Sequence, residues 1–159
     1  MQLNSCDNVY DMEPVMLTRD VNLDLPVDDL WSLVADPEGL GLWLGDSVDL
    51  DVQPGGTGVV RDDDSAGTVI RHVRVDRVEP VHELAFTWWR DDDPGAASHV
   101  VFRLTPVPGG SHLHITETLP PLPSASLTAT ALACTARIAW EVRAISLWAC
   151  AAATATALV

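Results

Sequence analysis

The sequence contains no lysine, so all nine of its permanently cationic side chains are arginines. With 23 acidic residues, the 159-residue chain has a formal net charge of −14 at pH 7. Such an acidic surface repels nucleic-acid phosphates and anionic lipids, and we expect neither nucleic acid nor a membrane as a partner. The missing lysine also excludes a P-loop, because the GxxxxGK[ST] motif needs that side chain to reach the phosphates of a nucleotide.

Cysteines and long apolar runs are also scarce. Cys6, Cys134 and Cys150 lie far apart and form no CxxC or Cys/His spacing typical of a zinc site. We therefore expect reduced thiols and a cytoplasmic protein. The longest uncharged stretch, residues 144–159, is shorter than the ~20 apolar residues of a membrane-spanning helix. Residues 1–15 lack the apolar run of a signal peptide and are interpreted as a flexible leader.

The five histidines show neither an HExxH pattern nor the spacing of a catalytic triad. His112 and His114 could chelate a metal from one strand face, but a period of two more simply turns both toward solvent. His72 is a candidate acid–base group only if its strand has the opposite phase. We predict neither a metal site nor a cofactor.

Acidic and glycine-rich turns separate short alternating segments. The tetrapeptide RDDD occurs at residues 61–64 and 90–93, and both copies are interpreted as solvated hairpin tips that form a negative rim at one end of a sheet. Neither has the spacing of an EF-hand calcium loop. The stretch PGGTG, residues 54–58, is interpreted as a turn between two strands, since alternating segments flank it on both sides.

The order of the segments predicts a single α+β domain over residues 16–159. Residues 16–25 alternate as in a strand, Pro26 suits the first position of a helix, and a second short helix is expected to end at Gly45. Six further strands are expected between residues 48 and 119, as an antiparallel meander. A long apolar helix is predicted at about residues 123–150, packed on a curved sheet in an arrangement that usually leaves a cavity.

Four stretches, in this order, resemble the START/Bet v 1-like (SRPBCC) superfamily, and more narrowly its AHSA1-like branch, the homologues of the activator of Hsp90 ATPase. They are RDVNLDLPVDDLWSLVADPEGLGLWLGD, VQPGGTG, VRVDRVEPVHELAFTWW and VVFRLTPVPGGSHLHITETL. The resemblance covers about residues 18–119. It implies a helix-grip fold with an internal pocket for a hydrophobic or amphipathic small molecule, and it does not imply a reaction.

Charged residues in phase with apolar neighbours are the candidate ligand anchors. Arg71 alternates with inward valines, Arg90 is in phase with Trp88, and Glu117 follows Ile115 by two. A buried charge is costly unless it is paired. Each could therefore anchor a ligand, as an arginine holds a carboxylate, or could reach water at a strand end, and Arg90 and Glu117 could pair. The candidate ligand-binding residues are Arg71, Phe86, Trp88, Arg90, Phe102, Glu117, Ile138 and Trp140.

These features favour a binding protein that carries, sequesters or senses a hydrophobic small molecule. The alternative is a polyketide cyclase- or aromatase-like enzyme in which Arg71, Arg90 or Glu117 moves protons or stabilises an enolate. A third hypothesis is an interaction module like the Hsp90 co-chaperone domain. The apolar C-terminal helix could also mediate a homodimer.

Overall fold

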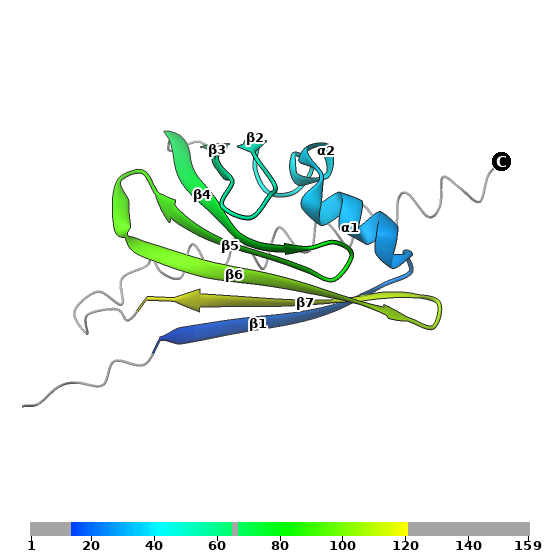
Figure 1. Ribbon diagram of the computed structural model, residues 1–159. Helices are drawn as coiled ribbons and strands as arrows, with labels where there is room; N and C mark the ends of the chain where they lie inside the picture. The colour runs from blue at the N-terminus through cyan, green and yellow to red at the C-terminus, as the bar shows by residue number, and fades with distance from the viewer. Residues whose placement is uncertain (1–13, 65–66, 121–159) are drawn as a thin grey trace, which may run out of the picture.

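The computed structural model describes residues 14–64 and 67–120 (Figure 1). The predicted helix at 123–150, the candidate ligand contacts Ile138 and Trp140, and the three cysteines lie outside these residues. So does nearly all of the expected leader. The extent of the domain and a dimer through the C-terminal helix therefore stay predictions.

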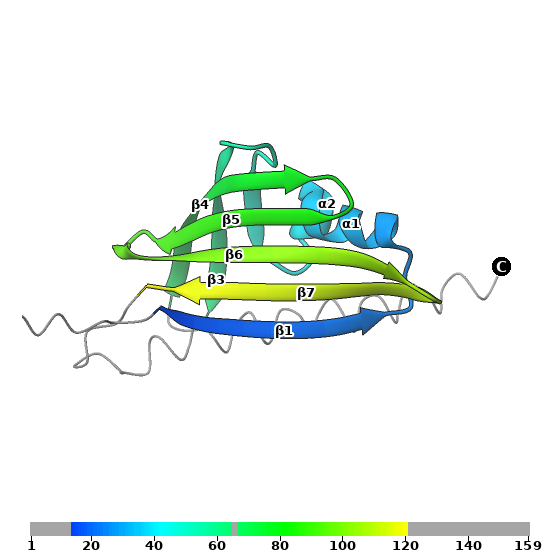
Figure 2. The same ribbon diagram turned by 60° about the horizontal axis from the view of Figure 1, so that its bottom comes forward.

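The described residues contain seven strands, as the alternating segments predicted. They are β1 (Val15–Leu23), β2 (Ser47–Leu50), β3 (Thr57–Asp64), β4 (Gly67–Glu79), β5 (Glu83–Arg90), β6 (Asp93–Val107) and β7 (Gly110–Leu119). All pair antiparallel in one curved sheet of order β1-β7-β6-β5-β4-β3-β2 (Figure 2). The meander from β2 to β7 is therefore confirmed, and β1 completes the sheet beside the last strand.

Two short helices connect β1 to β2. Helix α1 (Val27–Ala35) follows Pro26, which lies just before the helix rather than at its first position. Asp28 and Asp29 occupy the first turn, where the helix dipole favours negative charge. The extended Asp36 ends α1, as expected of a residue before proline, and α2 (Pro37–Leu40) begins at once. Both helices lie at one end of the sheet (Figure 1).

The face of the sheet on which α1 packs, called the inner face, carries the core. Period two places one apolar set on this face, as predicted, while His99 and Arg103 are exposed on the other. The buried inner-face side chains include Val60, Val73, Val75, Leu84, Phe86, Val100, Phe102, Leu104, Leu113 and Ile115.

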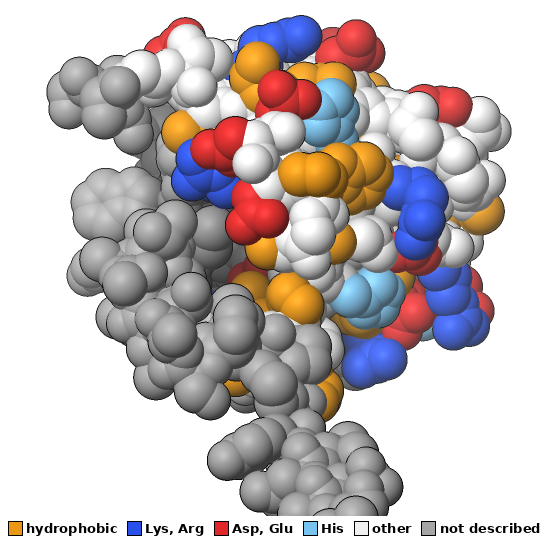
Figure 3. Space-filling model, turned by 90° about the vertical axis from the view of Figure 1, so that its left-hand side faces the viewer, with side chains coloured by type: hydrophobic (Ala, Val, Ile, Leu, Met, Phe, Trp, Pro, Cys, Tyr) orange, Lys and Arg blue, Asp and Glu red, His pale blue; other side chains and the backbone are white. Residues whose placement is uncertain are grey.

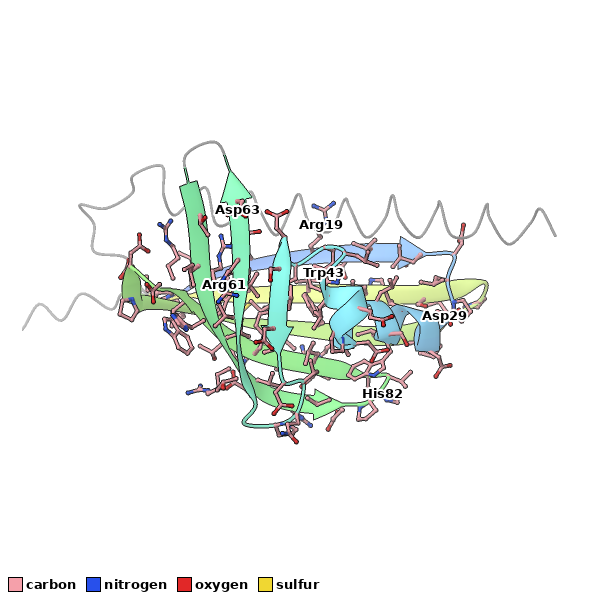
Figure 4. The ribbon with its side chains drawn as sticks, turned by 90° about the horizontal axis from the view of Figure 1, so that it is seen from above. Arg19, Asp29, Trp43, Arg61, Asp63 and His82 are labelled. Carbon is pink, nitrogen blue, oxygen red and sulfur yellow. The ribbon has the colours of Figure 1, made fainter. Side chains whose placement is uncertain are left out.

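Trp43 joins the helices to this core. Its indole Nε1 donates a hydrogen bond to the Leu33 carbonyl oxygen at 2.8 Å. Its ring meets Phe102 edge to face, with centroids 5.4 Å apart, and Figure 4 shows Trp43 lying over the sheet beside the helices. One side chain therefore satisfies a backbone carbonyl of α1 and packs on β6.

The glycine-rich stretch is a turn between β2 and β3, as predicted. Gly55 has a φ of +83°, which favours glycine. A Cβ on Gly56 would lie 2.0 Å from the Asp51 carbonyl oxygen. Backbone hydrogen bonds of 2.8 Å join Gly55 N to Val75 O and Val75 N to Gly56 O, next to a β-bulge in β4. The glycines therefore serve the fold.

No helix among the described residues is long and apolar enough to cross a membrane.

Candidate ligand-binding site

A row of polar side chains crosses the inner face, at the end of the sheet opposite the helices. It contains Asp62 of β3, Arg71 of β4, Ser98 of β6 and Glu117 of β7, and all four are buried. Trp88 of β5 lies between Arg71 and Ser98. Because these five strands are successive neighbours in the sheet, residues 55 positions apart in the sequence meet in one network.

The register of the strands brings the side chains of the polar row next to one another. Trp88 lies opposite Val73 on one side and Ser98 on the other, and Glu117 lies opposite Val100. Directly opposite residues of an antiparallel pair point to the same face. Ser98 and Glu117 are diagonal neighbours, close enough for their side chains to meet.

Glu117 is the centre of this network. Its Oε1 accepts hydrogen bonds from Ser98 Oγ at 2.7 Å and from Trp88 Nε1 at 3.2 Å, and Trp88 Nε1 also donates to Ser98 Oγ at 2.7 Å. Its second oxygen, Oε2, is buried without a hydrogen-bond partner, and Glu117 as a whole is only 2% exposed. A buried polar atom without a hydrogen bond costs roughly 1–3 kcal/mol of stability. A hydrogen bond to Oε2 from a bound molecule would remove this cost.

The environment also changes the acidity of Glu117. Burial raises the pKa of its carboxyl above the ordinary value, against the lowering effects of the Ser98 and Trp88 hydrogen bonds and of the Arg71 charge. No ion pair joins Glu117 to a cation among the described residues.

Arg71 and Asp62 form a buried ion pair at the other end of the row. The Arg71 guanidinium carbon also lies 5.1 Å from the centroid of the Trp88 ring, within the range of a cation–π contact. The charge of Arg71 is therefore met by a carboxylate and an aromatic face.

A second, apolar row leads from the helices to the polar row. The ring of Trp43 contacts the ring of Phe102. The ring centroids of Phe102 and Phe86 are 5.8 Å apart, as are those of Phe86 and Trp88, and each of the three pairs meets edge to face. We call Trp43, Phe102, Phe86 and Trp88 the aromatic row. Trp88 belongs to both rows, so an apolar surface and a buried carboxyl adjoin on the inner face.

The structure brings most of the described candidate residues together. Arg71, Trp88 and Glu117 all lie in the polar row, and Phe86 and Phe102 adjoin it. Arg90 is separated from Trp88 by a β-bulge, is partly exposed and makes two hydrogen bonds to Asp92, of 2.7 and 2.8 Å. Arg90 therefore pairs with Asp92, in the turn after β5, rather than with Glu117.

Three polar residues of the inner face were not among the candidates. Asp62 was assigned to a solvated tip, but it is 3% exposed, because β3 continues past Arg61 and keeps Asp62 in phase with Val60. Ser98 is in phase with Val100, and the same alternation could have identified it. Arg19 lies opposite Ile115 and is half-buried, extending from the edge strand β1 (Figure 4).

Asp63, Asp91 and Asp92 of the RDDD stretches are exposed, as expected of solvated tips, but each has a polar partner. Asp91 contacts His72 at 2.8 Å, Asp92 pairs with Arg90, and Asp63 accepts a hydrogen bond from Thr68 at 2.6 Å. Seen from this end, acidic and basic side chains intermix on the surface (Figure 3). The expectation of a solvated tip is therefore wrong for the buried Asp62, and the charges of Asp91 and Asp92 are met by His72 and Arg90.

The histidines of β4 and β7 lie on the outer face, as predicted. His72 stacks on Trp89 with centroids 5.8 Å apart. His112 and His114 both contact Asp20 Oδ1, at 3.1 and 2.8 Å. Within residues 14–64 and 67–120, no group of three His, Cys, Asp or Glu side chains is arranged to hold a metal ion.

Two helices followed by a meander, with the first strand beside the last in a curved seven-stranded sheet, define a Bet v 1-like (SRPBCC) architecture. The sequence comparison places the chain more narrowly. Residues 24–138 match the family described as Activator of Hsp90 ATPase homolog 1-like protein, and the chain belongs to this family. The comparison with curated proteins gave no match.

Solved structures share the fold at low sequence identity. An uncharacterized protein from Rhizobium leguminosarum has a TM-score of 0.71 at 19% identity, over 86% of this chain and 95% of that one. Ara h 8.0201 has a TM-score of 0.71 at 14% identity, over 87% and 99%. DynU16, from the dynemicin biosynthetic locus, has a TM-score of 0.64 at 22% identity, over 82% of this chain and 46% of that one. These likenesses show the fold alone.

Proposed function

We propose that this protein binds a hydrophobic or amphipathic small molecule at the inner face of its sheet, with Glu117 as the polar anchor. The observation that carries the proposal is the buried, unpartnered Oε2 of Glu117 beside the aromatic row. A ligand that gave Oε2 a partner would remove a cost of roughly 1–3 kcal/mol while burying its own apolar surface.

The polar row argues against a ligand carboxylate held by arginine. Arg71 already pairs with Asp62 in the core, so a second carboxylate would compete with a partner fixed in place. An uncharged polar group fits the carboxyl of Glu117 better, since it adds no further charge to a buried site. We therefore expect an apolar ring system or chain that carries few charges.

Native mass spectrometry against a library of uncharged and anionic amphiphiles tests this proposal. The likeness to DynU16 concerns the fold, and it guides only the inclusion of dynemicin in the library. We expect one molecule bound per chain, from the uncharged part of the library, and weaker binding to Glu117→Ala. Glu38→Gln, which alters an exposed carboxyl on α2, should bind as the wild type does. Equal binding to wild type and Glu117→Ala would place the ligand elsewhere.

One observation favours a second candidate function, an enzyme of the cyclase or aromatase type. A buried carboxyl with a raised pKa is suited to protonate the carbonyl oxygen of a substrate during enolisation, while a water molecule accepts the proton from the adjacent carbon. Glu117→Gln, which keeps a hydrogen-bond donor but has no acidic proton, should then abolish turnover of a bound ketone and leave its binding intact. Solvent deuterium exchange next to the carbonyl, followed by NMR, measures that step. Exchange at equal rates with both proteins would remove Glu117 from such a mechanism.

A further inference from the structure

We propose that the ligand carries a carbonyl oxygen and that Glu117, in its acid form, donates a hydrogen bond to that oxygen from Oε2. This inference rests on the proposed function and names the class of ligand: an uncharged, largely apolar ketone or quinone. It follows from the hydrogen-bond directions in the polar row, the charges around Glu117 and the unpartnered oxygen.

The hydrogen-bond directions decide which oxygen carries the proton. An indole N–H can only donate, so Trp88 donates to Ser98 Oγ and to Glu117 Oε1. Ser98 has one hydroxyl proton, and its bond as a donor goes to Oε1 at 2.7 Å. Oε1 therefore already accepts from two neutral donors, and a proton on the carboxyl resides on Oε2.

The surrounding charges favour that acid form. The charged residues that face Glu117 from β3 and β4 are Asp62 and Arg71, and they neutralise each other. The charged residue on β5 is Arg90, which pairs with Asp92. Arg19 of β1 shares the inner face but lies opposite Ile115 rather than Glu117. Burial is the largest influence on the Glu117 carboxyl, and it raises the pKa.

A protonated Oε2 is a buried donor that needs an acceptor. A carbonyl oxygen accepts and brings no donor of its own, so it satisfies Oε2 without leaving another group unpaired. A carboxylate ligand would bring a charge into a site where the cation Arg71 already has Asp62 as a partner. Trp88 and Phe86, which contact edge to face, would give the ring system beside the carbonyl an apolar surface.

Matched probes test the inference. Fluorene with 9-fluorenone, and indane with 1-indanone, differ within each pair by the carbonyl alone and cover two sizes. We expect isothermal titration calorimetry to show the ketone binding the wild type about tenfold more tightly than its hydrocarbon, as one hydrogen bond of average strength provides. The preference should fall as pH rises through the Glu117 pKa, because an ionised carboxyl cannot donate.

Variants of Glu117 distinguish the effect of its hydrogen-bond donor from the effect of its charge. Glu117→Gln should keep the ketone preference at every pH, since its amide nitrogen still donates, and Glu117→Ala should lose it. Glu38→Gln is the control and should follow the wild type. If Glu117→Ala does not fold, Glu117→Gln and the pH series still decide the question.

Other results would contradict either the carbonyl inference or the proposed function. Equal affinity for ketone and hydrocarbon would overturn the carbonyl inference and leave small-molecule binding in place. A preference that grows with pH would show that ionised Glu117 accepts from the ligand, which contradicts the inference. Failure of all four probes to bind would count against the proposed function itself, and with it against this inference.

Discussion

The carboxyl of Glu117 contributes to the pH dependence of stability. Its pKa is raised in the folded chain above the ordinary value of about 4.5. Between the unfolded and folded pKa values the native state binds more protons, so the free energy of unfolding falls as pH rises through this window. One proton gives a slope of at most about 1.4 kcal/mol per pH unit.

Glu117→Gln removes this titration. We expect its free energy of unfolding, relative to the wild type, to increase as pH rises above the ordinary carboxyl pKa of about 4.5 and to level off above the folded pKa. Urea denaturation at a series of pH values measures the difference, with Glu38→Gln as the control. A separation between variant and wild type that stays constant over the whole range would show that Glu117 has no raised pKa.

Asp62 is the residue whose removal should affect the fold most directly. Asp62→Ala leaves the Arg71 guanidinium buried without its carboxylate, and we expect a loss of about 3–5 kcal/mol in the free energy of unfolding. Asp49→Ala, at an exposed position of β2, should change it by no more than about 0.5 kcal/mol.

The double variant Asp62→Leu/Arg71→Met identifies the cause of that loss. Because it removes both charges, it should be more stable than Asp62→Ala alone. Urea denaturation at neutral pH compares all three proteins. A double variant that is less stable than Asp62→Ala would mean that the unpaired charge is not the cause.

Period two was sufficient to predict which way Arg71 and Glu117 point, because Arg71 is followed on its face of β4 by the buried Val73 and Val75, and Glu117 follows the buried Leu113 and Ile115 on β7. It failed at Asp62 because the acidic composition of RDDD is typical of a solvated turn, whereas β3 continues to Asp64. Arg19 shares a face of β1 with Leu17 and Val21, so the alternation of that strand could have identified it.

At the scale of elements, the glycine-rich turn is the clearest case of sequence determining geometry. Gly55 adopts the left-handed conformation, and Gly56 passes so close to Asp51 that a side chain has no room. The pairing of this turn with Val75 then fixes where β3 begins beside β4. The absence of lysine excluded a phosphate loop, and the flanking alternation identified the turn.

Gly56→Ala should therefore destabilise the sheet. Its Cβ would lie 2.0 Å from the Asp51 carbonyl oxygen, so backbone must move, and we expect a loss of about 1–3 kcal/mol. Gly95→Ala is a matched control near the start of β6, where the nearest atom to the added Cβ is Asp93 Oδ1 at 3.8 Å. Urea denaturation compares the two, and equal effects would mean that the tight contact at Gly56 is not what constrains this turn.

At the scale of the whole molecule, the helices lie at one end of the sheet (Figure 1), and the aromatic row connects Trp43 beside them to Trp88 in the polar row. The order of segments predicted the sheet and the two helices. The network around Glu117 could not be predicted, because it depends on the register of five strands. The contact of Ser98 with Glu117, 19 residues apart, is set by how β6 pairs with β7.

The most direct test of the central claim is the indole Nε1–H signal of Trp88 in a ¹H–¹⁵N NMR spectrum during titration with 9-fluorenone. The signal is identified by its absence from Trp88→Phe, and Trp89, stacked on His72 on the outer face, serves as the internal control. Binding beside Glu117 changes the hydrogen bonds of Trp88, so we predict that its signal shifts and saturates while that of Trp89 stays in place. A Trp88 signal that does not move at a saturating concentration of a bound probe would contradict the account.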